Sequence, residues 1–157
     1  MVPGMKSWLV LAAFIVFCFG AAGLGGLATG RSVDTWYKEL AKPAWTPPAW
    51  VFGPVWSLLY LAMAIAAWRV WQKEGLRAPL ALFGVQIVFN AAWSWLFFGL
   101  RLPGAACVDV VLLWAAIIAT TAAFWRVDLA AGVLFVPYLL WVTFAMLLNM
   151  AIWRMNS

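Results

Sequence analysis

Five long apolar stretches, separated by short polar segments, dominate the pattern of the chain. They cover about residues 7–28, 48–70, 79–100, 105–125 and 129–153. About 20 apolar residues in a helix cross the roughly 30 Å hydrocarbon core of a bilayer, so each stretch is long enough to span it. The first stretch is longer than the apolar region of a cleaved signal peptide, and we interpret it as a retained span. The pattern predicts an all-α integral membrane protein, in which residues 1–157 form one domain, a bundle of five transmembrane helices.

Three of the expected helices have a face of aromatic and polar side chains. Helical spacing groups Phe52, Trp56 and Tyr60, then Gln86, Asn90, Trp93, Ser94 and Phe97, and finally Tyr138, Trp141, Ala145 and Leu148. An amide in hydrocarbon is costly unless it is hydrogen-bonded, so the face with Gln86 and Asn90 must look into the bundle. For Asn90 two interpretations stay open: a hydrogen bond to another helix, or a contact with a bound ligand.

Small residues gather in the second half of the first span. Gly26 and Gly30 form a GxxxG pattern, and Ala22 extends it by one turn. Small residues let helices approach one another closely in lipid. We expect this face to pack against a neighbouring helix of the same chain, with a dimer contact as the alternative.

The longest polar segment, residues 29–47, follows the first span. Trp36 and Tyr37 lie within it, among charged residues that comprise Arg31, Asp34, Lys38, Glu39 and Lys42. Because paired aromatic rings need something to cover, we expect a loop over one mouth of the bundle, with a short helix that Asp34 caps. The prolines that follow stiffen the entry into the second span, since each fixes φ and restricts the residue before it.

Two residues inside the expected spans are unusual for a transmembrane helix. Asp109 lies near the start of the fourth span, where a carboxylate either favours the helix N-terminus or pairs with Arg101 across the preceding turn. Pro137 lies well inside the fifth span, where it is expected to kink or loosen the helix.

Composition supports the membrane assignment. Of the 157 residues, 68% are hydrophobic and 10% are charged, against roughly half and a quarter in a soluble domain. The net charge of +5 favours anionic lipid over nucleic acid as a partner, since the chain has no basic run or polar tail. Basic residues divide five against five between the two ends of the expected bundle, so the positive-inside rule assigns no orientation.

The sequence offers little conventional catalytic chemistry. It contains no histidine, which removes the commonest metal ligand and general base. Cys18 and Cys107 lie in apolar stretches and are expected to act as small hydrophobic residues. No nucleophile–base pair, metal-ligand set or phosphate loop occurs, so a binding protein is favoured over an enzyme and no cofactor is expected.

The order of several short motifs resembles one family, the translocator proteins, also called tryptophan-rich sensory proteins or peripheral benzodiazepine receptors. The resemblance covers nearly the whole chain. It rests on Trp36-Tyr37, on Lys42 to Pro48, on Gly53-Pro54-Val55-Trp56, on Gln86, Asn90 and Trp93, on Phe97-Phe98-Gly99 with Arg101, on Asp109, and on Pro137 to Trp141.

This resemblance implies a five-helix bundle, commonly a homodimer, whose long first loop caps a cavity. Members of the family bind porphyrins such as protoporphyrin IX, synthetic isoquinoline carboxamide and benzodiazepine ligands and, in animals, cholesterol. By resemblance, the ligand-binding residues are Trp36, Tyr37, Trp56, Asn90, Trp93, Trp141, Ala145 and Leu148. Basic residues of the loop, Arg31, Lys38 or Lys42, are expected to meet the porphyrin carboxylates.

The resemblance also suggests alternative activities. Light-dependent porphyrin breakdown in bacterial members is associated with the tryptophans that match Trp56 and Trp141. Tetrapyrrole or sterol transport is a further alternative, although no inverted repeat indicates alternating access. The family's cholesterol motif needs a tyrosine where this chain has Met150, so sterol binding is at most weak, and a bacterial membrane is the expected location.

Overall fold

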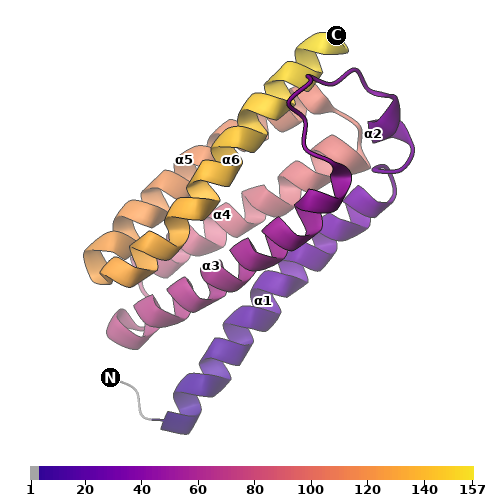
Figure 1. The fold of residues 1–157 in the computed structure, drawn as a ribbon. Coiled ribbons are helices and arrows are strands. Elements are labelled where there is room, and N and C mark those ends of the chain that lie inside the picture. Colours follow the sequence, from indigo (N-terminus) through magenta and orange to yellow (C-terminus); the bar gives the residue numbers. More distant parts are fainter. Residues whose placement is uncertain (1–3) are drawn as a thin grey trace.

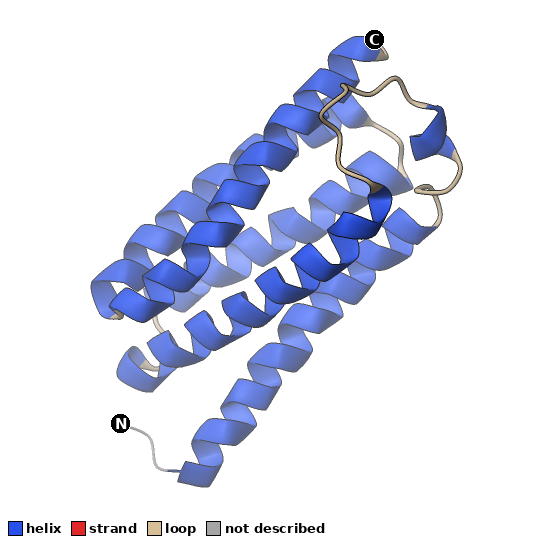
Figure 2. Ribbon diagram, in the orientation of Figure 1, coloured by secondary structure: helices blue, strands red, loops and turns tan. Residues whose placement is uncertain are grey.

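The structure, a computed structural model, describes residues 4–157. Helices account for most of these residues, and no strand occurs among them, which confirms the all-α prediction (Figure 2). The elements are α1 (Gly4–Gly30), α2 (Trp36–Glu39), the 3₁₀ turn η1 (Ala49–Val51), α3 (Phe52–Glu74), α4 (Ala78–Ser94), the π-helical turn η2 (Trp95–Gly99), α5 (Pro103–Val127) and α6 (Leu129–Met155).

Five helices are long and apolar enough to cross a membrane. Their ranges are Lys6–Gly30, Ala49–Glu74, Ala78–Gly99, Pro103–Val127 and Leu129–Met155. They run up and down in one bundle, so the described ends of the chain lie at opposite ends of the molecule (Figure 1). The chain is therefore an integral membrane protein that crosses the bilayer five times.

Local sequence signals set the ends of the long helices. Gly75 adopts φ of 70° directly after α3, a conformation that costs glycine little. Proline occupies the first turn of both α4 and α5, where its missing N–H costs no hydrogen bond. Asp128 caps α6, because its Oδ1 accepts a hydrogen bond from the Ala131 N–H at 3.0 Å.

Aromatic side chains fill the half of the bundle that contains the α3–α4 and α5–α6 turns. Phe83, Phe124 and Phe135 are buried there, with ring centroids 5.0–6.2 Å apart. Tyr138 continues this packing toward the middle of the bundle, 5.8 Å from Phe135. The opposite half, under the loop that follows α1, contains the large cavity described below.

Two groups of exposed tryptophans mark the levels of the membrane surfaces. Trp8 and Trp125 lie near one end of the bundle, and Trp45, Trp50 and Trp153 lie near the other. Tryptophan is enriched at bilayer interfaces, where its ring is apolar and its N–H reaches polar groups. Leucine and valine side chains are exposed between these levels, as expected of helices that face lipid.

The GxxxG pattern does not pack against another helix within the described chain. A Cβ atom added to Gly26 or Gly30 would meet nothing within 4 Å. The close approach occurs at Gly25, where an added Cβ would lie 3.0 Å from Ser94 Oγ. The internal-packing interpretation of Gly26 and Gly30 is therefore wrong, while a dimer contact stays a prediction.

One further local prediction is wrong, and of the two alternatives for Asp109 the ion pair with Arg101 is not found, while the interaction with the helix N-terminus stays a prediction. The short helix after Asp34 exists as α2, but Thr35 is its N-cap residue and no side chain caps it. Asp34 instead pairs with Lys38 at 3.2 Å. Asp109 forms no ion pair with Arg101 within the described residues, and its buried Oδ2 has no hydrogen-bond partner there.

Candidate functional site

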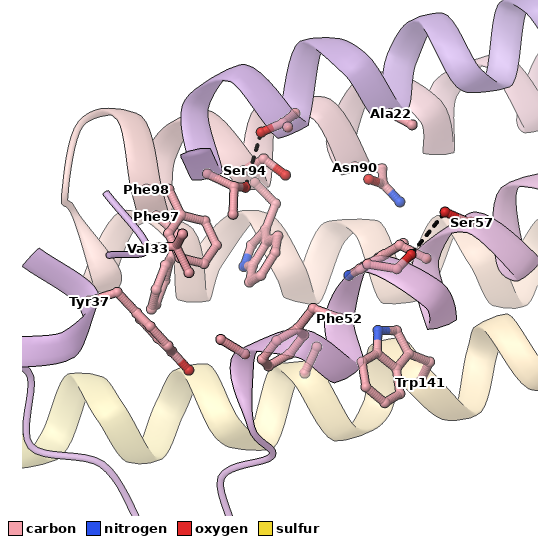
Figure 3. Close-up of a pocket in the computed structure, with 18 of the residues that line it drawn as sticks. Ala22, Val33, Tyr37, Phe52, Ser57, Asn90, Ser94, Phe97, Phe98 and Trp141 are labelled. Atoms are coloured by element: carbon pink, nitrogen blue, oxygen red, sulfur yellow. Dashed lines mark hydrogen bonds between the residues drawn. The ribbon is translucent and has the colours of Figure 1, made fainter. Parts of the chain in front are cut away.

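A cavity of about 510 Å³ lies at the loop end of the bundle, enclosed by α1, α3, α4, η2 and α6. Its volume falls within the usual range for small-molecule sites. In Figure 3 the side chains of Phe52, Asn90 and Trp141 point into this space from three different helices. α5 contributes no lining residue, because it packs behind α4 and α6.

The loop that follows α1 covers one end of the cavity, and we call residues 31–48 the lid loop. Within the lid loop, Tyr37 is buried, with its ring 6.2 Å from Phe97 and 5.5 Å from Phe98. Trp36 packs edge-on against Phe97 at 5.6 Å. The aromatic pair therefore packs against the π-helical turn η2, and Tyr37, but not Trp36, borders the cavity.

Hydrogen bonds fasten the lid loop at its start and its middle. Ser32 Oγ donates to the carbonyl oxygen of Phe98 at 2.6 Å. The Ala41 N–H donates to Asn156 Oδ1 at 3.0 Å, and Asn156 Nδ2 donates back to the Ala41 carbonyl at 2.9 Å. Because Asn156 follows α6, this reciprocal pair ties the lid loop to the far end of the chain.

Lys42 organises the lid loop from within. Its Nζ donates to the carbonyl oxygens of Tyr37 at 2.6 Å and Leu40 at 3.0 Å. The same Nζ lies 4.8 Å from the centroid of the Tyr37 ring, within cation–π range. Lys38 is engaged with Asp34. Neither lysine borders the cavity, nor does Arg31, so the structure places none of the three basic residues beside the cavity interior.

A chain of buried hydrogen bonds forms the polar floor of the cavity. Tyr60 Oη donates to Asn90 Oδ1 at 2.8 Å, and Asn90 Nδ2 donates to Tyr138 Oη at 2.6 Å. Tyr138 Oη in turn donates to Gln86 Oε1 at 2.7 Å. The hydrogen-bonding interpretation of Asn90 is therefore confirmed. Since Asn90 also borders the cavity, a ligand contact through its second N–H stays a prediction.

The π-helical turn η2 shapes the wall nearest the lid loop. The Leu100 N–H donates to the carbonyl of Trp95 at 2.7 Å, five residues back. This wider turn brings the adjacent residues Phe97 and Phe98 both to the cavity, with ring centroids 4.8 Å apart. In an α-helix, neighbouring residues point about 100° apart, so sequence periodicity predicted only Phe97. π-helical turns occur frequently at functional sites.

Four tryptophans line the cavity: Trp50 of η1, Trp56 of α3, Trp93 of α4 and Trp141 of α6. Trp93 Nε1 donates to Asn149 Oδ1 at 2.9 Å, which fixes its ring. Trp56 packs against Tyr60 and Tyr138, with ring centroids 5.7 and 6.2 Å apart. Trp141 Nε1 is buried and has no hydrogen-bond partner within residues 4–157. An unpaired buried donor costs about 1–3 kcal/mol, so an acceptor atom on a ligand would stabilise this side chain.

Almost all of the ligand-binding residues that the resemblance implied border the cavity. Those that border it are Tyr37, Trp56, Asn90, Trp93, Trp141, Ala145 and Leu148, and Trp36 is the exception. Sequence reasoning missed the contribution of α1, which supplies Phe19, Ala22, Gly25, Gly26 and Thr29. Gly26 was interpreted as a helix contact, but in the structure it borders the cavity, and a Cβ atom added to it would meet nothing within 4 Å.

The cavity lining is rich in aromatic side chains and carries little charge. Among residues 4–157, Asp34, at the mouth, is the one lining residue with a formal charge, and Lys38 pairs with it. Within the described residues no cluster of three or more histidine, cysteine or acidic side chains is placed to hold a metal ion. The arrangement suits a flat apolar ligand that stacks on aromatic rings and offers an acceptor to Trp141.

Comparison with known proteins gives a consistent result. A family model described as the TspO/MBR family matches residues 14–154. "Tryptophan-rich protein TspO" of Chlorobaculum tepidum is 41% identical over 155 residues, which cover 96% of this chain and 98% of the relative. "Tryptophan-rich sensory protein" of Cereibacter sphaeroides is 42% identical, with 96% and 93% covered. The human "Translocator protein" is 44% identical, with 77% and 75% covered.

Proposed function

Because the chain belongs to the TspO/MBR family, we propose that its cavity binds porphyrins, with protoporphyrin IX or haem as the ligand, and that binding serves a sensing role. The observation that carries this proposal is the buried, unpaired Trp141 Nε1 within an aromatic cavity of about 510 Å³. A porphyrin offers flat faces to Trp56, Trp93 and Phe97, and its ring can accept a hydrogen bond from Trp141 Nε1 through its π-system or, in the metal-free porphyrin, through an inner pyrrole nitrogen.

The positions of the charged residues around the cavity suggest an orientation for the bound porphyrin. The interior has no basic residue, whereas Asp34 borders the mouth and Arg31 lies on the exposed lid loop. Burial of a carboxylate without a partner is costly. We therefore expect the porphyrin carboxylates to stay at the mouth, near Arg31, while the macrocycle enters between the aromatic walls.

Replacement of Trp141 tests the proposal. Trp141→Phe keeps the ring that packs against Phe52 and Phe144 but removes the free N–H. Loss of one hydrogen bond, about 1 kcal/mol, should raise the Kd for protoporphyrin IX about fivefold. The measurement is quenching of tryptophan fluorescence in purified protein. Trp8→Phe, at the opposite end of the bundle and exposed, is the matched control. Equal Kd values for the two variants would contradict the proposal.

Light-dependent porphyrin breakdown is a second candidate, because Trp56 and Trp141 border the same cavity. Under illumination, the wild type should lose bound porphyrin absorbance faster than a Trp56→Phe, Trp141→Phe variant loaded to the same occupancy. Equal loss with free tryptophan in detergent would exclude a specific role for the protein.

The remaining family properties stay proposals for this chain. A homodimer is compatible with the GxxxG surface, since Gly26 and Gly30 are exposed. Transport of tetrapyrroles is the alternative to sensing, and it predicts protein-dependent entry of porphyrin into sealed liposomes. Sterol binding is expected to be at most weak, because Met150 stands where the family's cholesterol motif has a tyrosine. A bacterial membrane is our proposed location, although animal relatives match the chain as well.

A further inference from the structure

A second hollow lies at the end of the bundle away from the lid loop, and it shares no residue with the cavity. We call it the α3–α6 groove. It runs between the end of α3 and the beginning of α6, and its lining consists of Ile65, Arg69, Lys73, Asp128, Leu129, Ala130, Val133 and Leu134. One end of the groove is charged, and the rest is apolar.

The charged end lies at the level of the membrane surface. Trp68 directly precedes Arg69, Trp71 follows it by two residues, and exposed Trp125 precedes Asp128 by about one helical turn. Trp8 stacks on Trp68 at 5.7 Å. Because tryptophans gather at the headgroup level of a bilayer, Arg69 and Lys73 lie where lipid phosphates are found.

The charges in the groove are arranged with the acid inside and the bases outside. Arg69 Nε and Nη2 each donate to Asp128 at 3.1 Å, and Lys73 Nζ lies 2.8 Å from Asp128 Oδ2. Only 3% of the Asp128 side chain is exposed, against 39% for Arg69 and 53% for Lys73. One carboxylate is thus shared by two cations, and the surplus positive charge faces outward.

The cations keep donors that the protein does not use. Arg69 Nη1 forms no hydrogen bond within the described part of the chain. Lys73 Nζ contacts Asp128 and, at 3.4 Å, the carbonyl of Val127, which leaves a third N–H available. Arginine and lysine donors of this kind suit a phosphate oxygen.

The rest of the groove is an apolar surface that continues toward the middle of the bilayer. Leu129 is 61% exposed and Val133, one turn further along α6, is 50% exposed. Ile65 faces them from α3, one turn before Arg69. The groove therefore has a cationic end at the headgroup level and an apolar channel beside it.

We propose that the α3–α6 groove is a binding site for one anionic phospholipid. Its phosphate lies on Arg69 and Lys73, and an acyl chain runs along Leu129 and Val133. The charge of this end of the bundle favours an anionic headgroup over a zwitterionic one, since its basic residues outnumber its acidic ones. The basic residues are Lys6, Arg69, Lys73, Arg77 and Arg126, and the acidic ones are Glu74 and Asp128.

Thermal unfolding of the purified full chain in detergent tests this site. Added dioctanoyl phosphatidylglycerol should raise Tm in a saturable manner, because a ligand that binds only the folded state stabilises it. Dioctanoyl phosphatidylcholine and inorganic phosphate at the same concentrations should produce no saturable shift. An equal shift with phosphatidylcholine would overturn the proposal, and an equal shift with phosphate would show a simple anion site instead.

Variants locate the site. Lys73→Gln should raise the half-saturating concentration of phosphatidylglycerol about fivefold, because one basic residue near an anionic surface contributes about 1 kcal/mol. Arg77→Gln removes an exposed charge from the same end but outside the groove, and it should change that concentration less than twofold. Equal losses in the two variants would show diffuse surface attraction and overturn the site.

A second variant covers the case in which Lys73→Gln destabilises the protein. Leu129→Asp places a negative charge beside Lys73 at the first residue of α6, a position where an acidic side chain favours the helix. It should keep the fold and weaken the response to phosphatidylglycerol at least fivefold. An unchanged response in this variant would also overturn the proposal.

Discussion

At the scale of single residues, hydrogen-bonding capacity decides which polar side chains the interior of the bundle holds. Gln86, Asn90 and Tyr138 are almost fully buried, and each has a partner on another helix. Tyr138 Oη is the central member, because it accepts from one amide and donates to the other. Trp141 Nε1 differs from them in having no partner within the described residues, and for this reason it is the donor that the proposed ligand would satisfy.

Removal of the Tyr138 hydroxyl should destabilise the bundle more than removal of the Tyr60 hydroxyl. Tyr138→Phe leaves both an Asn90 N–H and Gln86 Oε1 unpaired, which we expect to cost about 1–2 kcal/mol, whereas Tyr60→Phe breaks one bond and should cost about 0.5–1 kcal/mol. Thermal unfolding of both variants in the same detergent measures the difference. Equal stability of the two variants would contradict the linked network.

Asp128 should make stability depend on acid pH. Burial would by itself raise the pKa of this carboxyl, but hydrogen bonds from Lys73, Arg69 and the Ala131 N–H outweigh it and hold the pKa well below its ordinary value. A group with a lowered pKa stabilises the fold above its unfolded pKa, about 3.9, and this contribution is lost as pH falls toward the folded pKa. The wild type should therefore begin to lose stability below about pH 5 and continue to lose it as the pH falls below 3 toward the folded pKa.

Asp128→Asn separates this contribution from helix capping, because asparagine also caps helices well. The variant should be about 1–2 kcal/mol less stable at pH 7, a modest loss since both cations are partly exposed. Its stability should fall less than that of the wild type on acidification. Parallel pH curves in thermal unfolding would show that Asp128 is not the responsible group.

At the scale of elements, small residues set how closely the helices approach. Gly25 of α1 lies against Ser94 of α4, and Gly132 of α6 lies against Trp125 of α5. The π-helical turn η2 also shapes the cavity, since it places two consecutive phenylalanines in one wall. The shape of the cavity thus depends on backbone positions as much as on the side chains that line it.

Gly132→Ala should destabilise the α5–α6 pair. A Cβ at this position would lie 2.8 Å from the Cα of Trp125, and backbone cannot move aside as the end of a flexible side chain can. Overpacking of this kind costs about 1–3 kcal/mol. Gly84→Ala is the control, because its Cβ would meet nothing within 4 Å and alanine favours helices by up to about 1 kcal/mol. Thermal unfolding should rank Gly84→Ala at or above the wild type and Gly132→Ala below it.

At the scale of the whole molecule, the bundle is filled at one end and hollow at the other. The cluster of Phe83, Phe124 and Phe135 occupies the filled end, and the lid loop covers the hollow end. This cover joins the loop after the first long helix to the residue after the last one, because Asn156 bonds Ala41 across 115 positions. Closure of the cavity is therefore a property of the folded chain as a unit.

Asn156→Ala should loosen the lid loop without unfolding the bundle. Loss of two exposed hydrogen bonds, worth about 0.5–1 kcal/mol together, should speed release of bound porphyrin two- to fivefold. Trypsin cleavage after Lys38 should accelerate as well, a readout that needs no ligand. Ser157→Ala, which does not touch the lid loop, is the control. Unchanged release and cleavage in Asn156→Ala would show that this pair does not fasten the lid loop.

The sequence alone determined the five helices and the faces that point inward. Whether a helix crosses the bilayer depends on the number and order of its apolar side chains. The spans can therefore be predicted from the sequence without knowledge of tertiary contacts. The same holds for Gln86, Asn90 and Tyr138, because a buried amide or hydroxyl must find a partner wherever the fold places it.

Only the tertiary structure decided how the cavity is bounded and closed. The approach of Gly25 to Ser94, the bond between Asn156 and Ala41, and the shared use of Asp128 by Arg69 and Lys73 join residues far apart in sequence. The π-helical turn η2 breaks the helical period on which sequence reasoning relies. Such features depend on distances between helices, and hydrophobic periodicity fixes which face of a helix is buried but not which residue it meets.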